Sequence, residues 1–85
     1  MSLNATLDIV VRALAGQAGV AEGSIDPGKP ISAVPGIESV KALRAITEIE
    51  DECDVVIPDD FLFESATVRE LADFVAGLAR EGSAI

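Results

Sequence analysis

Ser39 is the residue whose type and position are best suited to chemistry. It follows Gly36-Ile37-Glu38 at the end of a stretch rich in proline and glycine, and a helical pattern of apolar residues begins there. A hydroxyl at a helix N-terminus lies at the positive end of the helix dipole, which favours a bound or covalently attached phosphate. Serine is also a preferred N-cap residue, so an ordinary cap is the alternative. The spacing alone leaves both interpretations open.

Self-contained catalysis by Ser39 is disfavoured by its surroundings. The chain has no histidine, which removes the usual general base and the commonest metal ligand. Ser39 is not part of a Gly-x-Ser-x-Gly elbow. Lys41 lies two residues away on a helix, so the two side chains point in different directions. We therefore expect a protein that is not an enzyme.

A calcium site and a reactive thiol are also disfavoured. An EF-hand loop needs alternating ligands, a central glycine and a terminal glutamate, and Pro58 interrupts the acidic stretch that comes nearest to this pattern. Its aspartates are Asp51, Asp54, Asp59 and Asp60. Cys53 lies on the inward side of a helix, which favours a buried small hydrophobe. A lone cysteine forms no internal disulfide, so we expect a reducing, cytoplasmic setting. Because the acidic stretch does not fit a calcium loop, we also expect no metal site.

The charge of the chain limits its partners. Fifteen acidic and six basic residues give a net charge of -9, which repels nucleic-acid backbones and anionic membranes. Seven carboxylates and no cation lie between Glu48 and Asp60. Such a local field attracts partners that carry basic docking patches. A merely solvated, solubilising face is the alternative.

Three segments are predicted to lie around Ser39. Helical spacing of apolar residues predicts a helix from Asn4 to Ala18, with Asn4 or Ser2 as its cap. Prolines and glycines predict a long irregular connection from Gly19 to Gly36. Beyond it, a helix opening near Ser39 has one inward apolar stripe. The stripe comprises Ala42, Leu43, Ile46, Ile49 and Cys53.

The C-terminal part of the chain predicts two more helical segments. Residues 59–64 read as a short helical turn over the core, with Phe61 and Phe63 pointing to different sides. Thr67-Val68-Arg69-Glu70 is a capping box, and the helix that it opens is expected to end before Gly82. Its apolar face comprises Val68, Leu71, Phe74, Val75 and Leu78. The fold class is therefore all-α: a small four-helix bundle of three main helices plus one short helix, with a long first loop, in one domain over residues 1–85.

Glu38-Ser39-Val40, an acidic residue, a serine and an aliphatic residue opening a helix, resembles the attachment motif of acyl and peptidyl carrier proteins. The resemblance continues through the core positions of the second helix, through Val56-Ile57-Pro58-Asp59, and through Thr67-Val68-Arg69-Glu70-Leu71. It implies an acyl carrier protein-like bundle whose Ser39 accepts 4′-phosphopantetheine from coenzyme A. A separate magnesium-dependent phosphopantetheinyl transferase would catalyse the transfer, and the arm would carry cargo as a thioester.

Some residues depart from the usual carrier pattern. The family commonly has Asp and Leu beside the serine, where this chain has Glu38 and Val40. Lys41 and Arg44 stand where carriers of bacterial fatty-acid synthesis show acidic groups, and the string from Ser39 to Arg44 resembles peptidyl carrier domains. The overall acidity resembles free-standing acyl carriers. We expect a stand-alone, monomeric carrier of acyl intermediates for a fatty-acid, polyketide or other specialised pathway. An aminoacyl or peptidyl carrier and an unmodified acidic interaction module are the alternatives.

Five residues near Ser39 are expected to contact partners, which are the transferase, a loading ligase or synthase, and downstream enzymes. They are Glu38, Val40, Lys41, Arg44 and Glu48. Arg44 and Glu48 are also expected to pair with each other across one helical turn. Val40 either covers the edge of the bundle or inserts into a partner's groove.

Overall fold

Three α-helices form the described part of the protein. The structure is a computed structural model, and it describes residues 3–57 and 66–83. The helices are α1 (Leu3–Ala18), α2 (Ser39–Cys53) and α4 (Val68–Ser83), and two 3₁₀ turns at Glu22–Ser24 and Ile31–Ala33 lie in the connection between α1 and α2. No strand occurs in these ranges, which confirms the all-α prediction. The predicted turn at 59–64, with Phe61 and Phe63, lies outside the described residues.

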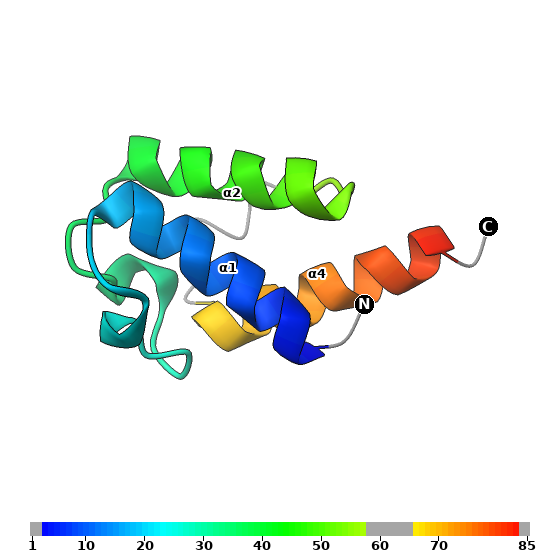
Figure 1. Ribbon diagram of the computed structural model, residues 1–85, viewed down its shortest axis with the longest axis horizontal. Helices are drawn as coiled ribbons and strands as arrows, with labels where there is room; N and C mark the ends of the chain where they lie inside the picture. Colours follow the sequence, from blue (N-terminus) through cyan, green and yellow to red (C-terminus); the bar gives the residue numbers. More distant parts are fainter. Residues whose placement is uncertain (1–2, 58–65, 84–85) are drawn as a thin grey trace.

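Helix α1 is the central element of the bundle. It packs against both α2 and α4, and it runs between them in Figure 1. Val10 and Leu14 of α1, one helical turn apart, are fully buried. Burying a side chain of this size contributes roughly 1.5–3 kcal/mol. The core is completed by fully buried Ile49 of α2 and Val68, Leu71 and Val75 of α4.

The inward stripe of α2 differs from the prediction at two positions, Leu43 and Ala45. Leu43 is 45% exposed, whereas Ala45 is fully buried. At about 100° per residue, Leu43 lies about 100° from the centre of the buried stripe and Ala45 only about 60° from it. The angular position of the helix decides which side chain is buried, and the larger apolar residue is left on the surface. The buried residues of α2 are Ala42, Ala45, Ile46, Ile49 and Cys53.

The capping box at the start of α4 is confirmed. The Glu70 N–H donates to Thr67 Oγ1 at 3.1 Å, and the Thr67 N–H donates to Glu70 Oε1 at 3.1 Å. Asn4 lies inside α1, which begins at Leu3, and the alternative predicted cap, Ser2, lies outside the described residues. The predicted end of α4 was wrong. Gly82 lies within α4, which continues to Ser83, because a single glycine near a helix end costs too little to stop it.

The connection between α1 and α2 is held in place by the start of α4. The Ile31 N–H donates to the Ala66 carbonyl at 3.2 Å, and the Val68 and Arg69 N–H groups donate to the carbonyls of Lys29 and Pro27 at 3.1 and 2.9 Å. An isolated antiparallel bridge joins Pro30 to Thr67. The irregular connection is therefore fixed against α4 by backbone hydrogen bonds.

A tight turn leads the chain from this connection into α2. The Ile37 N–H donates to the Val34 carbonyl at 3.2 Å, and Pro35 and Gly36 occupy the two central positions. Gly36 has φ +82°, as the third residue of a type II turn requires. A Cβ at Gly36 would lie 2.8 Å from the Ala18 carbonyl oxygen at the end of α1. Only glycine fits this turn without strain.

The described helices α1, α2 and α4 are each too short or too polar to cross a membrane.

Candidate functional site

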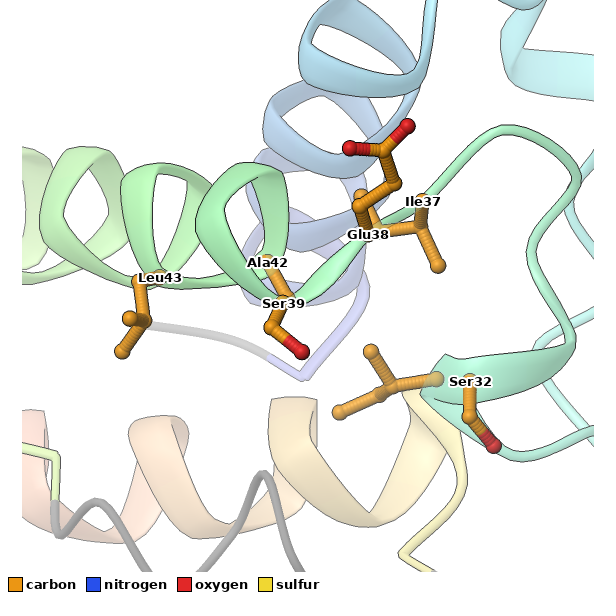
Figure 2. A pocket seen from close by; sticks show the side chains of 7 residues that line it. Ser32, Ile37, Glu38, Ser39, Ala42 and Leu43 are labelled. Carbon is orange, nitrogen blue, oxygen red and sulfur yellow. The ribbon is translucent and has the colours of Figure 1, made fainter.

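Ser39 is the first residue of α2, and its side chain is exposed. Glu38 is the N-cap, with extended backbone (φ -112°, ψ 167°), and its carboxylate makes no capping hydrogen bond. The two side chains point to opposite sides of the backbone in Figure 2, with the Ser39 hydroxyl directed at the cavity below the helix. Because the cap is Glu38, the reading of Ser39 as an ordinary N-cap serine was wrong, and its hydroxyl is left accessible.

Several backbone N–H groups in the first turn of α2 are not hydrogen-bonded within the described residues. The first bonded amide is that of Ala42, which donates to the Glu38 carbonyl at 2.7 Å. Within the described residues, the N–H groups of Ser39, Val40 and Lys41 donate no hydrogen bond. Unpaired amides at a helix N-terminus suit a phosphate group, because both the donors and the helix dipole favour negative charge. The predicted environment of the Ser39 hydroxyl is thus present.

A cavity of about 230 Å³ opens beside the Ser39 hydroxyl. Its far wall is formed by the second 3₁₀ turn, and its near wall is formed by the start of α2, as Figure 2 shows. Its surface is mostly apolar, so it suits a flexible hydrocarbon segment attached near Ser39. The lining residues are Ile31, Ser32, Ile37, Glu38, Ser39, Ala42 and Leu43.

Sequence reasoning missed three of these lining residues: Ile31, Ser32 and Ile37. Ile37 lies two residues before Ser39, so its proximity could have been inferred from the chain. Ile31 and Ser32 reach the site only because hydrogen bonds fix their turn against α4, and no local pattern signals that contact. They form one wall of the site and belong to it.

The outer side of α2 has a second hollow, which we call the α1–α2 groove. It has a volume of about 400 Å³. Val40, which is 58% exposed, and Leu43 supply its apolar surface, and Leu43 also lines the Ser39 cavity. The groove is lined by Gln17, Val40, Leu43, Arg44, Thr47 and Glu48.

The predicted pairing of Arg44 with Glu48 is absent from the structure. Glu48 Oε1 instead accepts a hydrogen bond from the Gln17 side-chain amide of α1. The one ion pair within the described residues joins Arg12 to Glu52 at 4.0 Å. Arg44 is exposed and Lys41 is half-buried. The five predicted contact residues therefore lie on the first three turns of α2 and at its cap, but they form no ion pair with one another.

The C-terminal end of α2 is fixed by local interactions of Glu50, Asp54 and Ile57. Asp54 is in the left-handed conformation with φ 55°, and Glu50 Oε2 accepts the Ile57 N–H at 2.8 Å. Cys53 is buried as predicted. Burial raises the pKa of the Cys53 thiol, and the neighbouring Glu52 carboxylate raises it further. The described residues contain no cluster of three potential metal ligands.

Comparison with known proteins is consistent with this site. The family model described as "Phosphopantetheine attachment site" matches residues 8–75. Gramicidin S synthase 2 of Brevibacillus brevis is 37% identical over 46 residues, which cover 54% of this chain and 1% of that protein. Gramicidin S synthase 2 of Aneurinibacillus migulanus matches with the same identity and coverage. The chain thus spans about 1% of the length of the curated relatives it matches.

Proposed function

Because the chain belongs to the family of phosphopantetheine attachment domains, whose members carry a covalently attached 4′-phosphopantetheine group, we propose that Ser39 is its attachment residue. The observation that carries this proposal is the exposed Ser39 hydroxyl at the start of α2, beside amides of Ser39, Val40 and Lys41 that have no partner in the described residues. Unpaired amides at a helix N-terminus, together with the helix dipole, would stabilise a phosphodiester on Ser39.

The chemistry of attachment requires a second protein. The Ser39 oxygen would form a bond to the β-phosphorus of coenzyme A as the hydroxyl loses its proton to a base. The pyrophosphate bond of coenzyme A breaks, and adenosine 3′,5′-bisphosphate leaves. The chain has no histidine to accept that proton, so a phosphopantetheinyl transferase supplies the base and its magnesium ion. This chain contributes the nucleophilic hydroxyl and the amides around it, and it acts as a carrier and not as an enzyme.

The attached 4′-phosphopantetheine group would supply a terminal thiol that holds cargo as a thioester. We propose an acyl cargo for a fatty-acid, polyketide or other specialised pathway, in a monomeric carrier domain that acts in the cytoplasm. The similarity to gramicidin S synthase 2 supports a second candidate, an aminoacyl or peptidyl cargo. A flexible arm raises the effective concentration of either cargo at each enzyme the carrier visits.

We assign partner docking to the outer face of α2 near Ser39. Val40 is an exposed apolar residue there, which favours insertion into a partner over covering the bundle edge. Glu38, Lys41, Arg44 and Glu48 surround it on the same stretch of helix. A small apolar contact surrounded by charged side chains suits brief docking that is guided by electrostatics. The carrier could then bind a transferase, a loading enzyme and later enzymes one after another.

Intact-mass spectrometry tests the attachment residue. The chain is incubated with coenzyme A, magnesium and a broad-specificity phosphopantetheinyl transferase, together with Ser39→Ala and Ser32→Ala variants. Ser32 is an exposed serine in the wall of the same cavity, so it is the matched control. We expect a gain of one arm by the parent and by Ser32→Ala, and no gain by Ser39→Ala. A folded parent that gains no arm with two different transferases would favour the unmodified interaction module.

A further inference from the structure

The outer face of α2 carries charge of opposite sign at its two ends. Lys41 and Arg44 lie within two turns of Ser39, whereas Glu48, Asp51 and Glu52 follow towards the C-terminal end. At about 100° per residue, Val40, Arg44 and Asp51 lie within about 40° of one another on the outer face. Beyond the N-cap residue Glu38, a partner that lies along this face therefore meets Arg44 nearer to Ser39 and the Asp51 carboxylate farther from it.

The cations beside Ser39 are not neutralised by the chain. Within residues 4–57 and 66–79, no carboxylate lies within 4.0 Å of Lys41 or Arg44, and the one ion pair joins Arg12 to Glu52. Glu48 is engaged by Gln17. Of the described residues that line the groove, Arg44 is the one cation, and it forms no ion pair there. The groove has an open place for a carboxylate from another molecule.

The same groove has unpartnered apolar surface. Three large hydrophobic residues are exposed among those that the structure describes, and two of them, Val40 and Leu43, line the α1–α2 groove. Leu43 could not be buried in the angular position that α2 adopts, and it packs instead between the groove and the Ser39 cavity. An apolar side chain flanked by a carboxylate would therefore match the groove in both respects.

We propose that the α1–α2 groove binds a partner segment in which an apolar side chain is flanked by a carboxylate that pairs with Arg44. This proposal rests on the proposed carrier function, because it concerns the enzymes that act on cargo at Ser39. It specifies their chemistry: the docking surface beside their active-site entrance is apolar and acidic, and basic groups lie farther along it, opposite Asp51 and Glu52. The net charge of the chain alone would indicate a basic surface throughout.

Two matched peptides test whether the groove prefers an acidic or a basic partner. One helical peptide carries two leucines one turn apart, flanked by glutamates, and the second has lysines in place of the glutamates. Each is titrated into the ¹⁵N-labelled chain while amide chemical shifts are recorded. We expect the glutamate peptide to shift the amides of Val40, Leu43 and Arg44. We expect the lysine peptide to shift amides towards the C-terminal end of α2 instead.

Two charge-reversal variants locate the carboxylate. Arg44→Glu should weaken binding of the glutamate peptide about five-fold, because an exposed ion pair contributes up to about 1 kcal/mol. Arg69→Glu makes the same change of charge on an exposed residue of α4 outside the groove, and it should leave binding nearly unchanged. Val40→Ser should also weaken binding, since it removes apolar surface from the groove without removing core contacts.

Three results would overturn the proposal. They are groove shifts caused equally by the lysine peptide, equal weakening by Arg44→Glu and Arg69→Glu, and the absence of groove shifts with either peptide. The attachment of the arm at Ser39, measured by intact mass, is independent of all three. A chain that accepts the arm but shows none of the expected groove shifts would keep its carrier function and lose this docking chemistry.

Discussion

The N-termini of α2 and α4 are built in opposite ways. At the start of α4, the amides of Val68, Arg69 and Glu70 all donate hydrogen bonds, two of them to carbonyls of the α1–α2 connection and one to Thr67 Oγ1. At the start of α2, the amides of Ser39, Val40 and Lys41 donate none within the described residues. The difference separates a helix start that holds the fold together from one that is available to a ligand.

Hydrogen exchange should show this comparison most strongly. The amides of Val40 and Lys41 are unpaired at an exposed helix start and should exchange at close to their unprotected rates. The amides of Arg69 and Glu70 are hydrogen-bonded, so their exchange should be slower by a factor of roughly ten or more. Nuclear magnetic resonance of the unmodified chain measures all four in one sample. Equal protection at the two helix starts would contradict the comparison.

Gly36→Ala should distort the open start of α2. The substitution places a Cβ at a positive φ and 2.8 Å from the Ala18 carbonyl oxygen, so we expect a loss of roughly 1–3 kcal/mol in the free energy of unfolding and slower arm transfer to Ser39. Chemical denaturation and transferase kinetics measure the two effects. Gly23→Ala is the matched control, because its Cβ would meet no atom within 4 Å. Equal losses in the two variants would argue against a special role for Gly36.

The two helix-start hydroxyls should differ in their contribution to stability. Thr67→Ala removes the acceptor for the Glu70 amide and should lower the free energy of unfolding by about 1 kcal/mol, a fall of roughly 4–8 °C in Tm. Ser39→Ala should change it by less than about 0.5 kcal/mol, because an exposed hydroxyl without a partner is lost. Thermal unfolding of both variants makes the comparison. A Ser39→Ala loss as large as that of Thr67→Ala would mean that Ser39 also has a structural role.

The smallest effect is expected at the closed, C-terminal end of α2. The pKa of the Cys53 thiol is raised by burial and then by Glu52, so the folded state disfavours the thiolate more than the unfolded state does. Its contribution to stability is therefore complete below the unfolded pKa and is lost as pH rises through the raised folded pKa. Denaturation at neutral and alkaline pH should show a slight alkaline loss that Cys53→Ala removes. An unchanged alkaline loss in that variant would assign it to other groups.

Local signals explain which parts of this molecule could be predicted from the sequence. The capping box at Thr67 and Glu70 involves residues three apart, so the chain itself brings them together. The position of Ser39 after a turn-forming segment leaves two interpretations open, and the resemblance of Glu38-Ser39-Val40 to a carrier attachment motif favours the attachment site. Leu43 lies at the edge of the apolar stripe of α2. Whether a residue at that edge is buried depends on how the helix is turned against α1, and no local pattern encodes that packing.

The rest of the site depends on contacts that have no residue-type signature. Pro27 and Lys29 bind the start of α4 through backbone carbonyls, and every residue has such a group. The wall that Ile31 contributes to the Ser39 cavity therefore follows from tertiary structure alone. The same holds for Glu48, whose predicted partner Arg44 was displaced by Gln17 of a different helix.

The bonds between residues 27–31 and 66–69 also bear on when the chain becomes competent during its synthesis. A nascent chain that ends at residue 57 already contains α1, the connection, α2 and Ser39 itself. It still lacks Ala66, which binds the Ile31 amide, and the Val68 and Arg69 amides that bind the carbonyls of Lys29 and Pro27. The wall opposite Ser39 is then unsupported. We therefore expect efficient arm transfer only after residues 66–69 have left the ribosome and bound the connection.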